Sequence, residues 1–147
     1  MKNGYASLAV QTAISGVIMY LVMFVMIDGL GSFYNNLNMV YMTLMMVAPM
    51  TVLMVLAMGD MFPAKRANAV ILAVSAIAFF GSFALIRTQT TIGDTAFLRS
   101  MIPHHSGAIL MCREAKLQDP EVKRLCGEII KSQREEIDEM KTILQRL

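Results

Sequence analysis

The sequence predicts an all-α protein with three transmembrane helices followed by an extramembrane helical hairpin, which completes a four-helix bundle by dimerisation. Apolar residues make up 56% of the 147 positions, more than is usual in soluble domains. Of the 24 charged residues, 18 lie after Thr88, where apolar residues recur at helical spacing. We therefore expect a membrane domain over residues 1–87 and an extracytoplasmic helical hairpin over residues 88–147.

Three windows without a formal charge predict the membrane-spanning helices, since a helix needs about 20 apolar residues to cross a bilayer. A cleaved signal peptide is the alternative for the first window, but the apolar stretch is too long and one lysine is its whole positive region. The connectors 29–38 and 59–68 contain Gly, Asn or Pro, which are typical of turns. The expected spans are about 6–27, 39–58 and 69–86.

The distribution of basic residues predicts the orientation. Lys2, Lys65 and Arg66 fall on one side of the three spans, and the first connector has no basic residue. We expect the amino terminus in the cytoplasm of a bacterial inner membrane and residues 88–147 in the periplasm. The net charge is only +2 and no basic run with interleaved aromatics occurs, which argues against nucleic-acid binding.

The charged tail predicts two helices. Thr88–Gly93 should break the chain, Asp94 should cap a helix that runs to about Leu117, and Asp119 followed by Pro120 should begin the second helix. Each helix carries one apolar stripe, and two such helices packed only against each other leave part of each stripe exposed. A homodimer that forms a four-helix bundle would bury the remainder.

Soft and borderline metal donors gather on the first of these helices. His104 and His105 are the only histidines of the chain, and Met101, Met111 and Cys112 lie one or two turns away on neighbouring faces. In an antiparallel hairpin that turns near Asp119, His105 would face Gln133, and Met101 would lie near Glu136 and Ile137. A polar gap at one height of both stripes is costly unless its groups satisfy each other, a metal or water.

Donor softness favours copper at this gap. Di-iron helical bundles use Glu-x-x-His, whereas Met101 stands three positions before His104. Thioether and imidazole together suit Cu(I), and histidine accepts Cu(II) as well. Zinc held by His104, His105 and Glu136 is a weaker alternative because it leaves the methionines unexplained. The structural alternative is that the histidines form hydrogen bonds and the methionines fill the core.

Pro103 allows two interpretations of the local backbone, because proline inside a helix removes a hydrogen bond and clashes with the carbonyl of residue 99. One interpretation is a kink that directs His104 and His105 inward. The other is that Pro103 begins a new helix after a short turn through Ser100.

Residues 94–147 resemble the bacterial family known as domain of unknown function 305. The resemblance rests on Asp94, Phe97, the run Met-Ile-Pro-His-His at 101–105, and Gln-x-x-Glu-Ile-x-x-Met at 133–140. It implies a ferritin-like helical fold, an extracytoplasmic location, and a role in copper binding or tolerance. It implies five metal ligands, which are Met101, His104, His105, Met111 and Met140. Gln133 and Glu136 would be auxiliary groups. The single His-His hairpin, where longer members have two, again suggests dimerisation.

Cys112 and Cys126 lie at equal distances from Asp119, and the spacing directs both toward the contact between the helices. An oxidising compartment would permit a disulfide, but the Cα atoms must come within about 7 Å, which is closer than helix axes usually run. The alternatives are two buried thiols or a second soft metal site.

Methionines in the first half of the chain suggest a second function. Eleven of the 15 methionines lie between residues 19 and 61, and in the second span they recur at every fourth position, at Met42, Met46, Met50, Met54 and Met58. A thioether ladder could conduct Cu(I), and its Met-x-x-x-Met spacing is similar to that of eukaryotic copper-transporter channels. Against this, methionine in lipid is an adaptable apolar residue, and no charge inside a span marks an ion path.

The sequence therefore predicts a membrane-anchored copper-binding protein that sequesters or delivers copper or confers tolerance to it. Its expected partners are membrane lipid, a second copy of the chain, and periplasmic copper-handling proteins. No catalytic nucleophile, phosphate loop or acid/base pair is apparent, so we do not expect an enzyme. The alternatives are a metal-free structural or oligomerisation membrane protein and a Met-lined copper transporter subunit.

Overall fold

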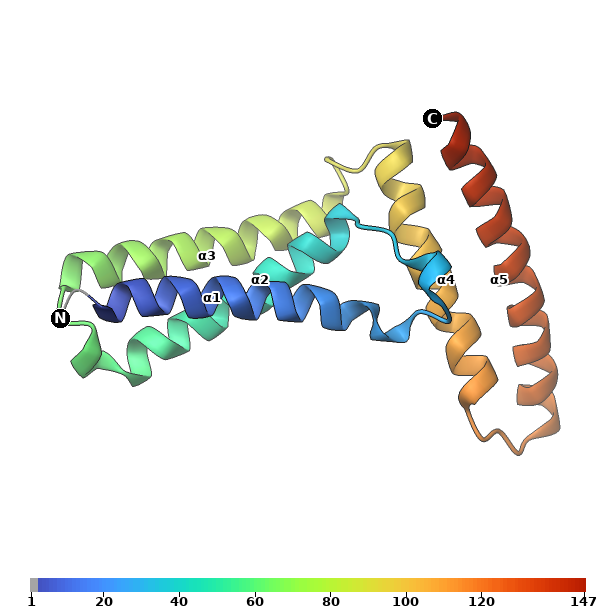
Figure 1. Ribbon diagram of the computed structural model, residues 1–147, viewed down its shortest axis with the longest axis horizontal. Helices are drawn as coiled ribbons and strands as arrows, with labels where there is room; N and C mark the ends of the chain where they lie inside the picture. The colour runs from blue at the N-terminus through green and yellow to red at the C-terminus, as the bar shows by residue number, and fades with distance from the viewer. Residues whose placement is uncertain (1–2) are drawn as a thin grey trace. The chain divides into compact units, whose positions relative to one another are not determined.

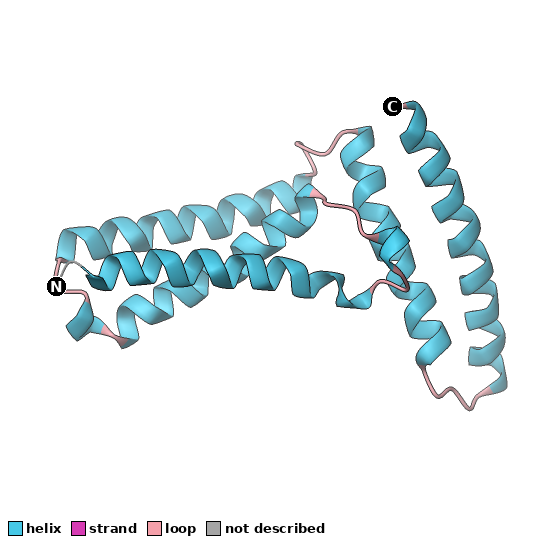
Figure 2. Cartoon of the chain, viewed as in Figure 1, coloured by secondary structure: helices cyan, strands magenta, loops and turns pink. Residues whose placement is uncertain are grey.

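The computed structural model describes residues 3–147 and is all-α within that range. Helices joined by loops account for this part of the chain, and it contains no strand (Figure 2). Three short 3-10 helices accompany five α-helices (Figure 1). They are η1 (Met23–Met26), η2 (Leu30–Ser32) and η3 (Gly59–Met61), with α1 (Asn3–Val22), α2 (Leu37–Ala57), α3 (Lys65–Thr88), α4 (Asp94–Glu114) and α5 (Pro120–Arg146).

Contacts divide the chain into two compact units. One contains residues 1–22 and 38–91, and the other contains residues 23–37 and 92–147. The second unit therefore joins the predicted hairpin to a segment that the sequence analysis had assigned to the first span and its connector. We refer to residues 23–37 as the linker segment.

Three helices of the chain are long and apolar enough to cross a membrane, as the sequence predicted. They cover Gly4–Met26, Leu37–Ala57 and Lys65–Thr88. The third ends where the Thr-rich stretch begins, and Gln89 there adopts a left-handed conformation with φ of 53°. This conformation ends a helix by letting the backbone N–H of Gln89 bond to the carbonyl of Leu85.

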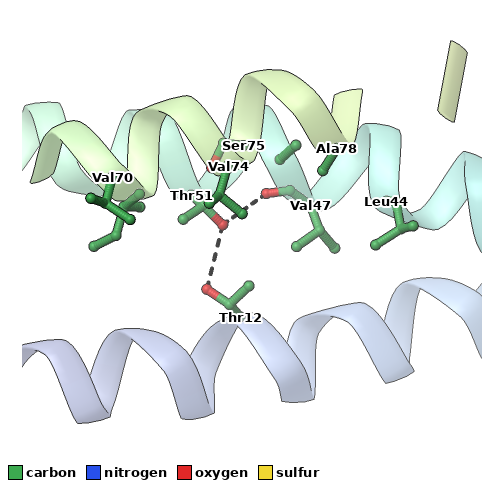
Figure 3. A pocket seen from close by; sticks show the side chains of 10 residues that line it. Thr12, Leu44, Val47, Thr51, Val70, Val74, Ser75 and Ala78 are labelled. Carbon is green, nitrogen blue, oxygen red and sulfur yellow. Dashed lines mark hydrogen bonds between the residues drawn. The ribbon is translucent and has the colours of Figure 1, made fainter. Parts of the chain in front are cut away.

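Hydroxyl groups occupy the interior of this three-helix unit. Thr43, Thr51, Ser75 and Ser82 are all buried. The hydroxyls of Thr12 on α1 and Thr51 on α2 lie 3.4 Å apart, beside a pocket of about 290 Å³ that residues of α1, α2 and α3 line (Figure 3). Small hydroxyl residues between membrane helices permit close approach and interhelical hydrogen bonds.

The methionines of α2 do not share one face of the helix. Residues four positions apart rotate by about 40° per step around a helix, so a long series drifts around it. Met42, Met46 and Met58 are exposed, whereas Met54 packs against a cluster of Leu8, Val55 and Phe62. Within one chain the series therefore does not line a continuous interior path.

Helices α4 and α5 form the predicted antiparallel hairpin (Figure 1). Asp119 caps α5 as expected, since its carboxylate accepts hydrogen bonds from the backbone N–H groups of Glu121 and Val122 at 2.8 and 3.0 Å. The side chains buried between the helices are Leu98, Ile102, Ile109, Ile137 and Met140, with Tyr34 of the linker segment packed against them.

One expectation for α4 was wrong, and the structure decides against one of the two interpretations of Pro103. The residue that caps α4 is Gly93 rather than Asp94, which lies in the first turn, where its negative charge favours the positive end of the helix dipole. Pro103 does not begin a new helix, because it lies inside one continuous helix from Asp94 to Glu114 and is buried there.

The linker segment is more than a turn between two spans. Its short helices η1 and η2 both contact α4. Residues 27–36 of the linker segment follow the first candidate span, and the hairpin follows the third. Their contact places both on the same side of any membrane that the three helices cross, as an odd number of spans requires.

A disulfide joins Cys112 of α4 to Cys126 of α5. The two Cα atoms lie 5.2 Å apart, within the range for a disulfide, because the short turn at 115–119 brings the two helix ends together. The expectation that helix spacing obstructs the bridge was therefore wrong, as were the alternatives of buried thiols and of a metal site at these cysteines. A disulfide in the hairpin fits an extracytoplasmic domain.

Replacing both cysteines with serine should destabilise the hairpin. Closing a loop of this size, with the two cysteines 14 positions apart, stabilises a fold by about 3 kcal/mol, mainly by restricting the unfolded chain. Thermal unfolding followed by circular dichroism should show a lower midpoint for the variant. A reductant should lower the midpoint of the wild type to a similar value and leave the variant unchanged, and a reductant effect on the variant would contradict this explanation.

Candidate metal centre

The central polar contact of the hairpin joins His105 of α4 to Glu136 of α5. His105 Nε2 lies 2.7 Å from Glu136 Oε2, and the histidine is only 7% exposed. His105 Nδ1 lies 2.9 Å from the backbone carbonyl oxygen of Met101, one turn earlier in α4. Both ring nitrogens are therefore engaged, as a buried imidazole requires.

These two contacts orient the ring. The carbonyl oxygen of Met101 can only accept a hydrogen bond, so Nδ1 donates to it. On the other side of the ring, Nε2 and Glu136 Oε2 form a hydrogen bond that joins the two helices.

Glu136 is held in its ionised form. Its pKa lies below the ordinary value because the Ser132 hydroxyl donates a hydrogen bond to Oε1 at 2.6 Å, with a further contribution from the hydrogen bond with His105. Partial desolvation opposes this shift without reversing it. Ser132 lies one turn before Glu136 on α5, so the carboxylate is also oriented from its own helix.

The partner predicted for His105 from the sequence was wrong. The prediction placed Gln133 opposite His105, whereas Glu136 occupies that position, about one turn further along α5. Gln133 itself is half-buried. The prediction assumed one constant register from the turn onward, but packed helices cross at an angle and their register changes along the contact.

The predicted thioether ligands fall into two groups. Met140 of α5 belongs to the buried cluster of the hairpin, and Met101 of α4 packs against that cluster. Met111 is 54% exposed and lies two turns from His104 along α4, a rise of about 10 Å. Met101 and Met140 thus both contribute to the apolar packing of the hairpin, each one turn along its helix from His105 or Glu136, whereas Met111 is exposed.

His104 differs from its neighbour in being exposed. Its ring centroid lies 6.0 Å from that of His105. Within residues 3–147, no three His, Cys, Asp or Glu side chains gather closely enough to hold a metal ion. The disulfide prevents Cys112 and Cys126 from contributing thiolates to a metal centre.

Sequence reasoning missed three polar residues around this centre. Ser132 orients Glu136, and Ser106 bonds to Asp28 of the linker segment. Asp28 is the only charged residue between Lys2 and Asp60, and an isolated charge at the end of an apolar span is a signal that a partner is needed. Nothing in the sequence marks Ser106 or Ser132 among the other serines.

These observations define a class of protein, an all-α chain with three candidate membrane spans and a disulfide-closed helical hairpin. Residues 83–145 match the family described as Domain of unknown function (DUF305). An uncharacterized protein of Acanthamoeba polyphaga mimivirus is 36% identical over 119 residues, which are 80% of this chain and 76% of the viral protein. The chain belongs to the DUF305 family, as the resemblance indicated. No solved structure matches it.

Ser132→Ala should raise the pKa of Glu136 toward its ordinary value, because it removes the hydrogen bond that lowers this pKa most. A lowered folded-state pKa contributes stability that is present above the unfolded pKa and lost as the pH falls through the folded one. In the variant this contribution is smaller and its loss is complete at a higher pH. The carboxyl carbon shift of Glu136, followed by NMR against pH, measures the change.

Thr142→Ala is the matched control, since the Thr142 hydroxyl on α5 donates to the backbone carbonyl of Asp138 rather than to Glu136. Its Glu136 titration should follow the wild type. A Ser132→Ala titration that also follows the wild type would show that the hydroxyl does not hold the carboxylate.

Proposed function

We propose that this protein is a membrane-anchored copper-binding protein, with its centre between α4 and α5. The observation that carries the proposal is that His105 of α4 contacts Glu136 of α5, with Met101 and Met140 each one turn away along these helices and both part of the apolar packing of the hairpin. Two thioethers and an imidazole in a largely apolar setting match the preferences of Cu(I), and the carboxylate adds a harder donor suited to Cu(II).

Each donor has a different role in this proposal. His104 is exposed and receives copper from outside, while Met111 is an outer donor further along α4. To bind copper through a ring nitrogen, His105 must give up one of its two hydrogen bonds. Glu136 then serves as a ligand or accepts a hydrogen bond from the remaining N–H, and Gln133 is an auxiliary group.

The setting of the hairpin suggests how the copper is used. The disulfide supports an oxidising, extracytoplasmic compartment, and three long apolar helices support attachment to a membrane. A copper protein in that setting sequesters copper or delivers it to periplasmic partners. A second copy of the chain would complete a four-helix bundle and add further donors.

A Met-lined transporter subunit is the weaker alternative. Met42, Met46 and Met58 are exposed on the outside of the three-helix unit. A conduit would therefore require several copies with these residues turned toward one another, whereas the hairpin already joins His105 to Glu136 within one chain.

Copper titration of the full-length protein in detergent tests the proposal. The wild type should bind Cu(I) tightly in competition with a chromogenic chelator. Met101→Leu, Met140→Leu and His104→Ala should each weaken binding by about tenfold or more, a typical loss for residues around a metal. Leucine nearly conserves the volume of methionine, so the hydrophobic core should remain packed.

Met58→Leu is the matched control, because it removes an exposed thioether outside the hairpin. Its copper affinity should equal that of the wild type. A wild-type protein that folds and oligomerises but does not take up Cu(I) or Cu(II) would refute the proposal and favour the structural alternative.

A further inference from the structure

The linker segment has two unlike faces. Phe24, Ser32 and Asn36 are buried, and Tyr34 packs against the hydrophobic core of the hairpin. Between the two candidate spans, two apolar side chains are exposed: the exposed fraction is 88% for Leu30 and 40% for Phe33. A short segment with one face held by protein and an apolar face left uncovered needs a second partner.

The first face is joined to α4 by a reciprocal pair of hydrogen bonds. The backbone N–H of Asp28 donates to Ser106 Oγ at 2.7 Å, and the Ser106 hydroxyl donates to the Asp28 carboxylate. Ser106 is completely buried, and Ser32 Oγ donates to the same carboxylate at 3.4 Å. We call this arrangement the Asp28–Ser106 clasp.

Gly107 lets the backbone come close at the clasp. A Cβ atom at this position would lie 3.4 Å from the carbonyl oxygen of Met26 and 3.8 Å from its Cβ. Glycine inside a helix costs up to about 1 kcal/mol relative to alanine, and here it makes room for the end of η1. Ser106 and Gly107 together therefore form a notch on α4 that receives residues 26–28.

Chain connectivity fixes where the second face lies. The first candidate span ends at Met26 and the second begins at Leu37. Only residues 27–36 separate them, so both ends of the linker segment meet the bilayer surface. Apolar and aromatic side chains at that depth partition into the boundary between headgroups and acyl chains.

We propose that the linker segment is an interfacial anchor that holds the hairpin against the membrane surface. Lipid at the headgroup boundary covers Leu30 and Phe33, while α4 covers the opposite face through the clasp. Because His105 directly precedes Ser106, the hairpin centre is held next to the bilayer. This proposal concerns the lipid contact and the clasp, and it does not depend on copper binding.

The absence of tryptophan from the sequence allows a direct test of depth. Leu30→Trp in the full-length protein, reconstituted in phosphatidylcholine and phosphatidylglycerol vesicles, gives a single fluorophore at the proposed lipid contact. In these vesicles the tryptophan emission should be blue-shifted. When the acyl chains are brominated, the emission should be largely quenched. Leu125→Trp, which replaces an exposed leucine of α5, should keep its emission.

Phe33→Trp provides a second reporter with an aromatic ring already at the site. Two results would overturn the lipid contact. Emission typical of water at both positions would place the segment in solvent, and blue-shifted emission without quenching by brominated lipid would mean that a second copy of the chain covers it.

Hydrogen exchange tests the clasp separately. Ser106→Ala should speed amide exchange across residues 28–36, because it removes both hydrogen bonds of the clasp. Thr142→Ala, on the exposed side of α5, should leave that exchange unchanged. Exchange in Ser106→Ala equal to that of the wild type would show that the clasp does not hold the linker segment to α4.

Discussion

Two neighbouring buried polar side chains on α4 constrain how the extramembrane part of this protein packs. His105 and Ser106 are adjacent and point to different sides of the helix, so one partner cannot satisfy both. Glu136 of α5 satisfies the histidine and Asp28 of the linker segment satisfies the serine. Helix α4 is consequently held between the rest of the hairpin and a segment more than 60 positions away in the sequence, and the centre lies where these constraints meet.

The same constraint affects the proposed metal chemistry. Without metal, both ring nitrogens of His105 already have protein hydrogen-bond partners, so the buried ring is satisfied. Copper would replace one of these hydrogen bonds rather than fill an empty space. Such a centre exchanges metal more readily than a preformed ligand cage, because the protein has a stable arrangement to return to when the metal leaves.

The sequence predicted the elements of this fold well and their contacts less well. Uncharged windows located the three long apolar helices, and Asp119 with Pro120 located the start of α5, because these signals are local. The partner of His105 was wrong by about one turn, since register depends on how the helices cross. The bond between Asp28 and Ser106 joins positions 78 apart, and no periodicity in a single sequence encodes such a pair.

The disulfide beside the hairpin turn can form in only one way within the chain. The chain contains only two cysteines, and both take part in this bond. One intramolecular pairing is therefore available during oxidation, so no wrong pairing within a chain has to be reshuffled. In an oxidising compartment, an oxidant alone is sufficient to close the hairpin, and an isomerase has no role in selecting the partner within the chain.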